Sequence, residues 1–178
     1  PDEFDPRFGT SPRVLMERNF QSIRRYAMTF GPGADNLLFV GGTGLGKTFL
    51  SACIARTVAD RGDSVVYETA NHLFSKLEQA KFNPSPDHQR EADRFLACDL
   101  LILDDLGAEF ATQFTVSVLY DIINTRLLRG HPTIISTNLT PGELRKTYSD
   151  RISSRLTGEY QVIPFYGTDV RKQKLQKS

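Results

Sequence analysis

The chain has 178 residues, of which 39% are hydrophobic and 24% are charged, and its formal net charge at pH 7 is +1. These values suit one globular domain with a full core; they exclude a disordered or fibrous chain and leave too little length for two ordinary domains. No apolar run approaches the roughly 20 residues that cross a bilayer, and the polar N-terminus is unlike a signal peptide, so we expect a cytoplasmic protein with no membrane segment.

Apolar runs alternate along the chain with segments of helical spacing. Residues 13–30 have the apolar spacing of a helix, which Gly31 and Pro32 end. Five short apolar runs then have the character of buried strands, at residues 36–40, 64–68, 100–103, 133–136 and 160–164. Because strands that alternate with helices usually pair in parallel and are covered on both faces, the pattern predicts an α/β fold with a five-stranded parallel sheet.

Four segments complete the expected elements. Residues 48–59 are predicted to form a helix after the first strand, and residues 112–128 form the longest amphipathic helix. Thr140 and Glu143 make a capping box with Pro141 at the first helical position, which predicts a short helix. Residues 81–94 are polar and contain two prolines, so we expect a loop or an insertion there.

The loop after the first strand is the most informative segment. Residues 41–48 read GGTGLGKT and match the pattern G-x-x-x-x-G-K-[ST] of phosphate-binding loops, the Walker A motif. Glycines let successive backbone N–H groups wrap a phosphate chain, and the helix N-terminus adds partial positive charge. Lys47 is expected to reach the β- and γ-phosphates of ATP, and the Thr48 hydroxyl to bind Mg²⁺. The residues expected to bind the nucleotide are Gly42, Thr43, Gly44, Leu45, Gly46, Lys47, Thr48 and Phe49.

Two acids follow the third apolar run. Asp104 and Asp105 come directly after four aliphatic residues, where a parallel strand delivers its carboxyl end to a ligand crevice. We expect Asp104 to hold Mg²⁺, directly or through water. Asp105, on the other face of the strand by simple alternation, is expected to polarise the water that attacks the γ-phosphate. Glutamate is the commoner residue at this position in such hydrolases, so Glu109 is kept as an alternative.

Polar residues near the fourth strand offer further candidates. Asn138 follows the strand and is expected to sense the γ-phosphate or orient water, although capping the turn before Thr140 is an alternative. Arg151 and Arg155 stand four residues apart on one helix face, which suits phosphate recognition. A pair of surface salt bridges explains that spacing equally well, so the spacing alone leaves both readings open.

The order of these motifs resembles that of the AAA+ ATPases, in particular the DnaC/DnaI-type helicase loaders and their relatives, the IstB-type transposition ATPases. The matching pieces are GGTGLGKTFLSACIA, LLILDDLGAE, IISTNLT, SDRISSRLTG and YGTDVRKQK. The resemblance implies a P-loop AAA+ domain over residues 20–170 with a reduced or absent C-terminal helical lid. Residues 1–19 would then be an extension or linker, and residues 171–178 a basic tail. Because the first residue is Pro1, we expect a fragment that lacks the family's separate N-terminal domain.

The resemblance also implies roles that spacing does not reveal. Arg155 is similar to the arginine finger that acts on ATP in the neighbouring subunit, with Arg151 as a helper, and Arg171 is similar to the sensor II arginine. Residues 73–95 occupy the place where the loaders insert helices that line a single-stranded DNA path. A solvated helical face is an equally good account of that segment. Its available cationic and aromatic groups are Lys76, Lys81, Phe82, Arg90 and Arg94.

The expected function is therefore that of an Mg²⁺-dependent ATPase, slow unless it forms a homo-oligomer with bound ATP. It would load the replicative helicase onto single-stranded DNA, and it would contact that helicase through the missing N-terminal region. A second candidate is an IstB-like transposition helper that binds duplex DNA. The third is a P-loop kinase or other phosphotransferase, which the paired acids and the strand-end Asn disfavour because they suit water as the acceptor.

Overall fold

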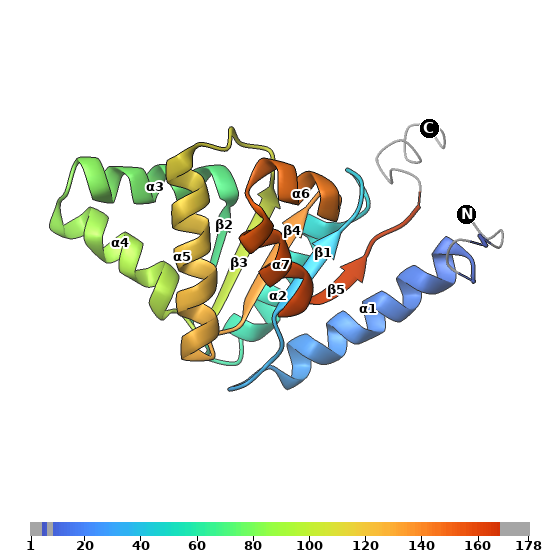
Figure 1. Cartoon of the computed structure of the whole chain (residues 1–178). Coiled ribbons are helices and arrows are strands. Elements are labelled where there is room, and N and C mark those ends of the chain that lie inside the picture. Colours follow the sequence, from blue (N-terminus) through green and yellow to red (C-terminus); the bar gives the residue numbers. More distant parts are fainter. Residues whose placement is uncertain (1–4, 7–8, 168–178) are drawn as a thin grey trace, which may run out of the picture.

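The computed structural model describes residues 5–6 and 9–167 (Figure 1). The C-terminal residues beyond Gly167, including Arg171, lie outside this part. Within it the elements are α1 (Pro12–Thr29), β1 (Leu37–Val40), α2 (Lys47–Ala59), β2 (Val65–Thr69), α3 (Ala70–Phe82), α4 (Pro86–Ala97), β3 (Leu100–Leu106), α5 (Gln113–Arg129), β4 (Thr133–Thr137), α6 (Pro141–Thr147), α7 (Asp150–Gly158) and β5 (Gln161–Pro164).

The five strands form one parallel sheet in the order β2-β3-β4-β1-β5. Each strand coincides with one of the five apolar runs, so the predicted α/β fold with a parallel sheet is confirmed. The order places β1, which leads into the glycine-rich loop, beside β4, and it places β3 with its two acids on the far side of β4. The carboxyl ends of all five strands therefore meet along one edge of the sheet.

Both faces of the sheet are covered. Alternate residues of one strand face opposite layers: Leu37 and Phe39 pack beneath α1 and α2, whereas Leu38 packs on the side of α3 to α7. Figure 1 shows α5 and α7 in front of the sheet and α2 behind it. Because both faces are buried, the strands are nearly continuous aliphatic runs instead of alternating ones.

The segment at residues 81–94 is mostly helical, because α3 ends at Phe82 and α4 begins at Pro86. The expectation of a loop is thereby corrected, whereas the alternative of an insertion stays a prediction. Ser85 is the N-cap of α4 and its hydroxyl accepts a hydrogen bond from the backbone N–H of His88, while Pro86 occupies the first turn. Proline fits there because the first turn needs no backbone N–H donor. The chain turns back between α3 and α4, and Figure 1 shows the pair at the end of the molecule opposite α1.

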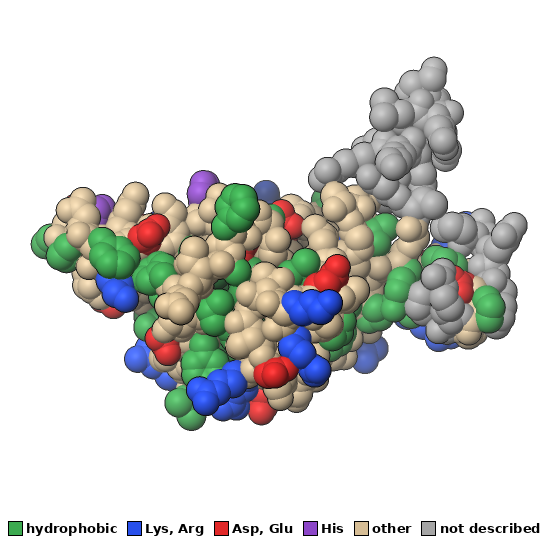
Figure 2. All heavy atoms as spheres, turned by 45° about the horizontal axis from the view of Figure 1, so that its top comes forward, with side chains coloured by type: hydrophobic (Ala, Val, Ile, Leu, Met, Phe, Trp, Pro, Cys, Tyr) green, Lys and Arg blue, Asp and Glu red, His purple; other side chains and the backbone are tan. Residues whose placement is uncertain are grey.

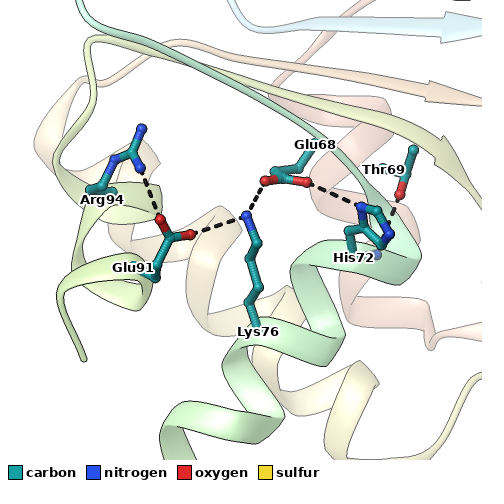
Figure 3. A network of polar contacts seen from close by, with 6 residues as sticks. All are labelled: Glu68, Thr69, His72, Lys76, Glu91 and Arg94. Atoms are coloured by element: carbon teal, nitrogen blue, oxygen red, sulfur yellow. Dashed lines mark hydrogen bonds and ion pairs between the residues drawn. The ribbon is translucent and has the colours of Figure 1, made fainter. Parts of the chain in front are cut away.

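A chain of charged groups joins this helix pair to the sheet (Figure 3). Lys76 of α3 hydrogen-bonds Glu68 of β2 and lies 3.0 Å from a carboxylate oxygen of Glu91 on α4. Arg94 donates to the other oxygen of Glu91 at 2.9 Å. The ammonium of Lys76 lowers the pKa of Glu91, and the hydrogen bond to Glu68 raises the pKa of Lys76. Both helices are thereby tied to the last residues of β2.

After β4 the described chain forms α6, α7 and β5, and both helices belong to the core layer. Leu144, Ile152 and Leu156 are fully buried there. Within the described residues the chain forms no helix after β5, and the reduced or absent C-terminal lid stays a prediction. None of the described helices is long and apolar enough to cross a membrane. The domain boundary expected before residue 20 falls inside α1.

Candidate functional site

A cavity of about 720 Å³ lies at the carboxyl edge of the sheet, between the glycine-rich loop and the ends of β2, β3 and β4. All but one of the residues expected to bind the nucleotide line it; the exception, Gly42, takes part through its backbone carbonyl, as described below. The lining residues are Thr43, Gly44, Leu45, Gly46, Lys47, Thr48, Phe49, Thr69, Asp104, Asp105, Ser136 and Asn138.

Glycine is required at two positions of the loop. A side chain at Gly41 would place its Cβ atom 2.3 Å from the carbonyl oxygen of Phe165, and the backbone φ of Gly41 is +147°. Gly46 is the N-cap of α2 with φ of +93°, and no side chain caps the helix there. The first N–H groups of α2 therefore remain without a side-chain partner and face the cavity, as an anion site at a helix N-terminus needs.

Lys47 is held at the floor of the cavity and is only 7% exposed. Its ammonium donates to the carbonyl oxygens of Gly41 and Gly42 at 2.5 and 2.8 Å and to Oδ1 of Asn138 at 2.6 Å. Burial lowers the pKa of Lys47, whereas Asp105 and Asp104 raise it. Three acceptors use all three ammonium protons, so a phosphate that reaches Lys47 must replace at least one of them.

The two acids reach the same cavity because β3 carries a bulge. Leu103 pairs with Ile135 and Leu106 pairs with Thr137, so Asp104 and Asp105 stand opposite Ser136 alone. Asp105 has φ of +59°, and no other non-glycine residue of the described chain lies in this left-handed region. Simple alternation placed Asp105 on the opposite face of the strand. That expectation is corrected: the extra residue re-aims its side chain into the cavity, and both acids line it.

Asp104 is 4% exposed and accepts hydrogen bonds on both carboxylate oxygens. The hydroxyl of Ser136 donates to Oδ1, and the hydroxyl of Tyr67 donates to Oδ2 at 2.7 Å. Within the described residues Asp104 forms no ion pair. Ser136 also accepts the backbone N–H of Asp105 at 3.0 Å, so one serine holds the two consecutive acids.

Asp105 and Lys47 are bridged by the predicted sensor residue. The amide nitrogen of Asn138 donates to Oδ1 of Asp105 at 3.2 Å, while its amide oxygen accepts from Lys47. The alternative expectation was that Asn138 caps the turn before Thr140. Its side chain does not do so, because Thr140 and Glu143 form the capping box at the start of α6. The candidate acid, amide and ammonium groups thus form one connected cluster.

Glu109, the alternative water-activating group, does not line the cavity. Its carboxylate accepts hydrogen bonds from the hydroxyl of Tyr148 and, at 3.1 Å, from the backbone N–H of Gly107. Tyr148 follows α6 and is buried in the core. Glu109 therefore holds the loop after β3. Of the two candidates for water activation, Asp105 is the one that lines the cavity.

Arg151 and Arg155 lie on α7 and do not line the cavity of their own chain. The Arg155 side chain is 43% exposed and lies 3.6 Å from a carboxylate oxygen of Glu159. Both side chains are accessible to a second molecule, so this placement is compatible with an arginine finger that acts on a neighbouring subunit. Arg171, the sensor II candidate, lies outside the described residues.

Sequence reasoning missed three residues at the site: Thr69 and Ser136, which line the cavity, and Tyr67, which hydrogen-bonds Asp104. The strand predicted at residues 64–68 ended one position before Thr69, which pairs with Asp104 across the sheet. Tyr67 and Ser136 act on Asp104 through their hydroxyls. The available signal was positional, since each residue stands at the carboxyl end of a strand next to β3. That signal becomes readable only when the order of the strands is known.

The family model described as "IstB-like ATP binding protein" matches residues 3–178, and the chain belongs to this family. The replicative helicase loader DnaC of Escherichia coli (strain K12) is 25% identical over 133 residues, which cover 75% of this chain and 54% of the relative. The putative insertion sequence ATP-binding protein y4pL of Sinorhizobium fredii (strain NBRC 101917 / NGR234) is 29% identical over 150 residues, covering 81% and 60%. The chain spans little more than half the length of these relatives.

Solved structures show the same fold. The crystal structure of the DnaC helicase loader superposes with a TM-score of 0.77 at 22% identity, covering 86% of this chain and 91% of that chain. The replication initiator DnaA bound to AMPPCP and single-stranded DNA gives a TM-score of 0.73 at 21% identity, covering 99% and 56%. The predicted AAA+ fold is thereby confirmed, and the family supports an ATP-binding role for the chain.

Proposed function

We propose that this IstB-like ATP-binding protein hydrolyses ATP as an oligomer and that its ATP cycle times the loading of a replicative helicase onto single-stranded DNA. The observation that carries the ATPase part is the single cavity in which Lys47, Asn138 and Asp105 form one hydrogen-bonded cluster beside the buried Asp104. The loader part is supported by the relationship to the helicase loader DnaC.

The nucleotide phosphates would lie against residues 42–49. Backbone N–H groups of the loop and of the first turn of α2 supply the donors, and Lys47 supplies the positive charge. Lys47 is already surrounded by acceptors within the cavity. Exchange of a neutral carbonyl or amide acceptor for a charged phosphate strengthens the contact, because attraction between two opposite charges is added to a hydrogen bond from the ammonium.

The residues of the cavity fit Mg²⁺. Magnesium prefers hard oxygen ligands and keeps several waters, and both Asp104, with its carboxylate, and Thr48, with its hydroxyl, line the cavity. The buried Asp104 has hydroxyl partners and no cationic partner among the described residues, as a carboxylate reserved for a cation would. Bound there, Mg²⁺ would neutralise charge that develops on the phosphates.

Asp105 is assigned to the attacking water. In the proposed step the water oxygen bonds to the γ-phosphorus, the bond from that phosphorus to the bridging oxygen of ADP breaks, and the water proton passes to Asp105 or to the released phosphate. Asn138 contacts both Asp105 and Lys47, so it would align the water with the γ-phosphate. Release of phosphate with no added acceptor distinguishes this reaction from that of a phosphotransferase.

Efficient turnover would need a second subunit. Arg155 is the proposed finger and Arg151 its helper, since both are exposed on α7 and neither reaches the cavity of its own chain. Removal of an arginine finger costs about 10³–10⁵ in rate in other P-loop enzymes. A dilute monomer should therefore bind ATP and hydrolyse it slowly, and its rate per subunit should rise with protein concentration.

Of the five groups first considered for single-stranded DNA, two remain available. Arg90 is paired with Asp87, and Lys76 and Arg94 are both paired with Glu91. Lys81 has no carboxylate partner among the described residues. It lies 5.5 Å from the ring centre of Phe82 and 5.1 Å from that of Phe114, two rings 5.8 Å apart.

Phe82 is 66% exposed, and Figure 2 shows hydrophobic and basic side chains side by side at the end of the molecule formed by α3 and α4. Exposed aromatic rings beside a cation suit sequence-independent stacking of bases. We therefore assign the proposed DNA contact to Lys81, Phe82 and Phe114, of which Phe114 was not anticipated from the sequence.

A transposition helper that binds duplex DNA is the second candidate. It is favoured by the family match and by the putative insertion sequence ATP-binding protein, which is 29% identical to this chain. The ATPase site is the same under both readings. The two proposals therefore separate at the partner and at the form of DNA that is bound.

The test joins this chain to any region that precedes it in its gene and asks, by size exclusion with Mg-ATP, whether the product co-elutes with the replicative helicase of the same organism. Co-elution that is lost without the upstream region supports loading. Absence of a complex, together with tight binding of duplex DNA in preference to single strands, contradicts loading and supports the transposition helper.

A further inference from the structure

We infer that Tyr67 is a positioning residue for Asp104: its hydroxyl fixes the carboxylate in the orientation that Mg²⁺-nucleotide binding requires. This inference rests on the proposed function of the same cavity. Its basis is the 2.7 Å hydrogen bond from the Tyr67 hydroxyl to Oδ2 of Asp104. The two residues belong to neighbouring strands and are 37 positions apart in the chain.

The strand register accounts for the contact. Tyr67 pairs with Ile102 and Thr69 pairs with Asp104, so Tyr67 lies two residues, or about 6–7 Å, below the acid along the strands. Because alternate residues share a face, Tyr67, Ile102 and Asp104 all face the layer of α2. A tyrosine side chain spans that rise, and its ring packs against the core on this face while its hydroxyl reaches the cavity edge.

The hydroxyl is a permanent donor. A tyrosine phenol ordinarily has a pKa of about 10, so it keeps its proton throughout the neutral range. Each oxygen of a carboxylate has two lone pairs. Tyr67 and Ser136 each use one, on different oxygens, which fixes the carboxylate plane and leaves one lone pair on each oxygen for water or metal.

The position of Tyr67 is itself fixed by its neighbours on β2. Glu68 faces the other layer and is bound to Lys76, which also pairs with Glu91 (Figure 3). The Thr69 hydroxyl accepts the backbone N–H of His72 as the N-cap of α3. These contacts with α3 and α4 thus anchor the end of β2 from which Tyr67 reaches Asp104.

Tyr67 is a cleaner probe of this orientation than Ser136. Ser136 also accepts the backbone N–H of Asp105, so its loss would disturb the bulge as well as Asp104. Tyr67→Phe removes one oxygen and keeps the ring in the core. Tyr26→Phe is the matched control, because the Tyr26 hydroxyl also makes a single hydrogen bond, to the carbonyl of Asp35 at 2.9 Å, and Tyr26 does not line the cavity.

The experiment titrates Mg²⁺ against each protein at a fixed concentration of a fluorescent ATP analogue, with a parallel binding curve in EDTA and a thermal melt. Loss of groups that orient a metal ligand typically costs 10–100-fold in metal affinity. Since Ser136 still holds one oxygen, we expect the Mg²⁺ midpoint of Tyr67→Phe to rise about 10-fold. Binding in EDTA should stay unchanged, and Tyr26→Phe should match the unmodified protein.

An Mg²⁺ midpoint for Tyr67→Phe within about twofold of that of Tyr26→Phe would overturn the inference and leave the proposed function intact. A parallel loss of binding in EDTA and in Mg²⁺ would overturn it as well, because that outcome describes a packing role. If the unmodified protein binds the analogue in neither condition, the proposed function fails, and the inference fails with it.

Discussion

Replacement of Asp105 by asparagine isolates the charge at the position proposed to activate water. Asp105 has φ of +59°, a region that asparagine tolerates nearly as well as aspartate, whereas alanine there costs about 1–2 kcal/mol. An asparagine keeps an Oδ1 atom that can accept the hydrogen bond from Asn138, now 3.2 Å long. Asp105→Asn should therefore change the free energy of unfolding by less than about 0.5 kcal/mol.

The expected effect on chemistry is much larger. A positioned general base contributes about 10²–10⁴ in rate, so kcat should fall by at least about 100-fold, which corresponds to about 2.7 kcal/mol on the barrier. Nucleotide affinity should be kept or rise slightly, since one negative charge near the phosphates is removed. A fall in kcat without a rise in KM is the pattern of an interaction made only in the transition state.

The assay measures steady-state phosphate release over a range of Mg-ATP concentrations up to saturation, at a protein concentration that favours oligomers. Asp60→Asn is the control, because Asp60 lies at the opposite end of α2 from the loop and its side chain is 69% exposed. Turnover of Asp105→Asn within about threefold of the control would refute the assignment of water activation to Asp105, because the loss of a general base costs about 10² or more.

Three further outcomes are expected. Lys47→Ala should lose nucleotide binding, measured by a fluorescent ATP analogue, because no other side chain of the described cavity carries a positive charge; binding within about tenfold of normal, or about 1.4 kcal/mol, would contradict this. Arg155→Ala should bind ATP normally and turn over about 10³-fold more slowly at high concentration, and mixing it with Lys47→Ala should restore phosphate release if the arginine acts between subunits. Arg126→Ala should lower the free energy of unfolding, measured in urea, by about 3–4 kcal/mol. The reason is that Arg126 is fully buried and donates to the carbonyls of Phe95 and Cys98. A loss under about 1 kcal/mol would show that water takes over the hydrogen bonds of the guanidinium.

Local signals predicted the strands and the glycine-rich loop. Leu37 to Val40 and Leu100 to Leu103 are apolar because both faces of the sheet are covered, and that requirement is visible in the sequence as runs without alternation. The start of α4 was also readable, because Ser85 and Pro86 have the chemistry of a cap and a first turn. Both prolines were taken for loop signals, but Pro86 occupies the first turn of α4, where proline is favoured.

The bulge at Asp104 and Asp105 could not be read from the chain alone. Whether one residue or two stand opposite Ser136 depends on the hydrogen-bond register between β3 and β4, which is a property of the assembled sheet. The same is true of Tyr67: its proximity to Asp104 follows from the pairing of β2 with β3, and a different strand order would leave its hydroxyl far from the acid.

The end of β2 is where the two proposed activities meet. On one face of this strand Tyr67 holds Asp104 in the nucleotide cavity, and on the other face Glu68 holds Lys76 and, through it, Glu91 of the helix pair proposed to contact DNA. The strand backbone links the two side chains, since consecutive residues point to opposite faces and a displacement of the backbone moves both. A shift of α3 and α4 on binding DNA would therefore first displace Glu68, the residue next to Tyr67. That connection gives a physical route by which DNA could alter the Mg²⁺ dependence of nucleotide binding, and the ion pairs of Lys76 are the contacts that transmit it.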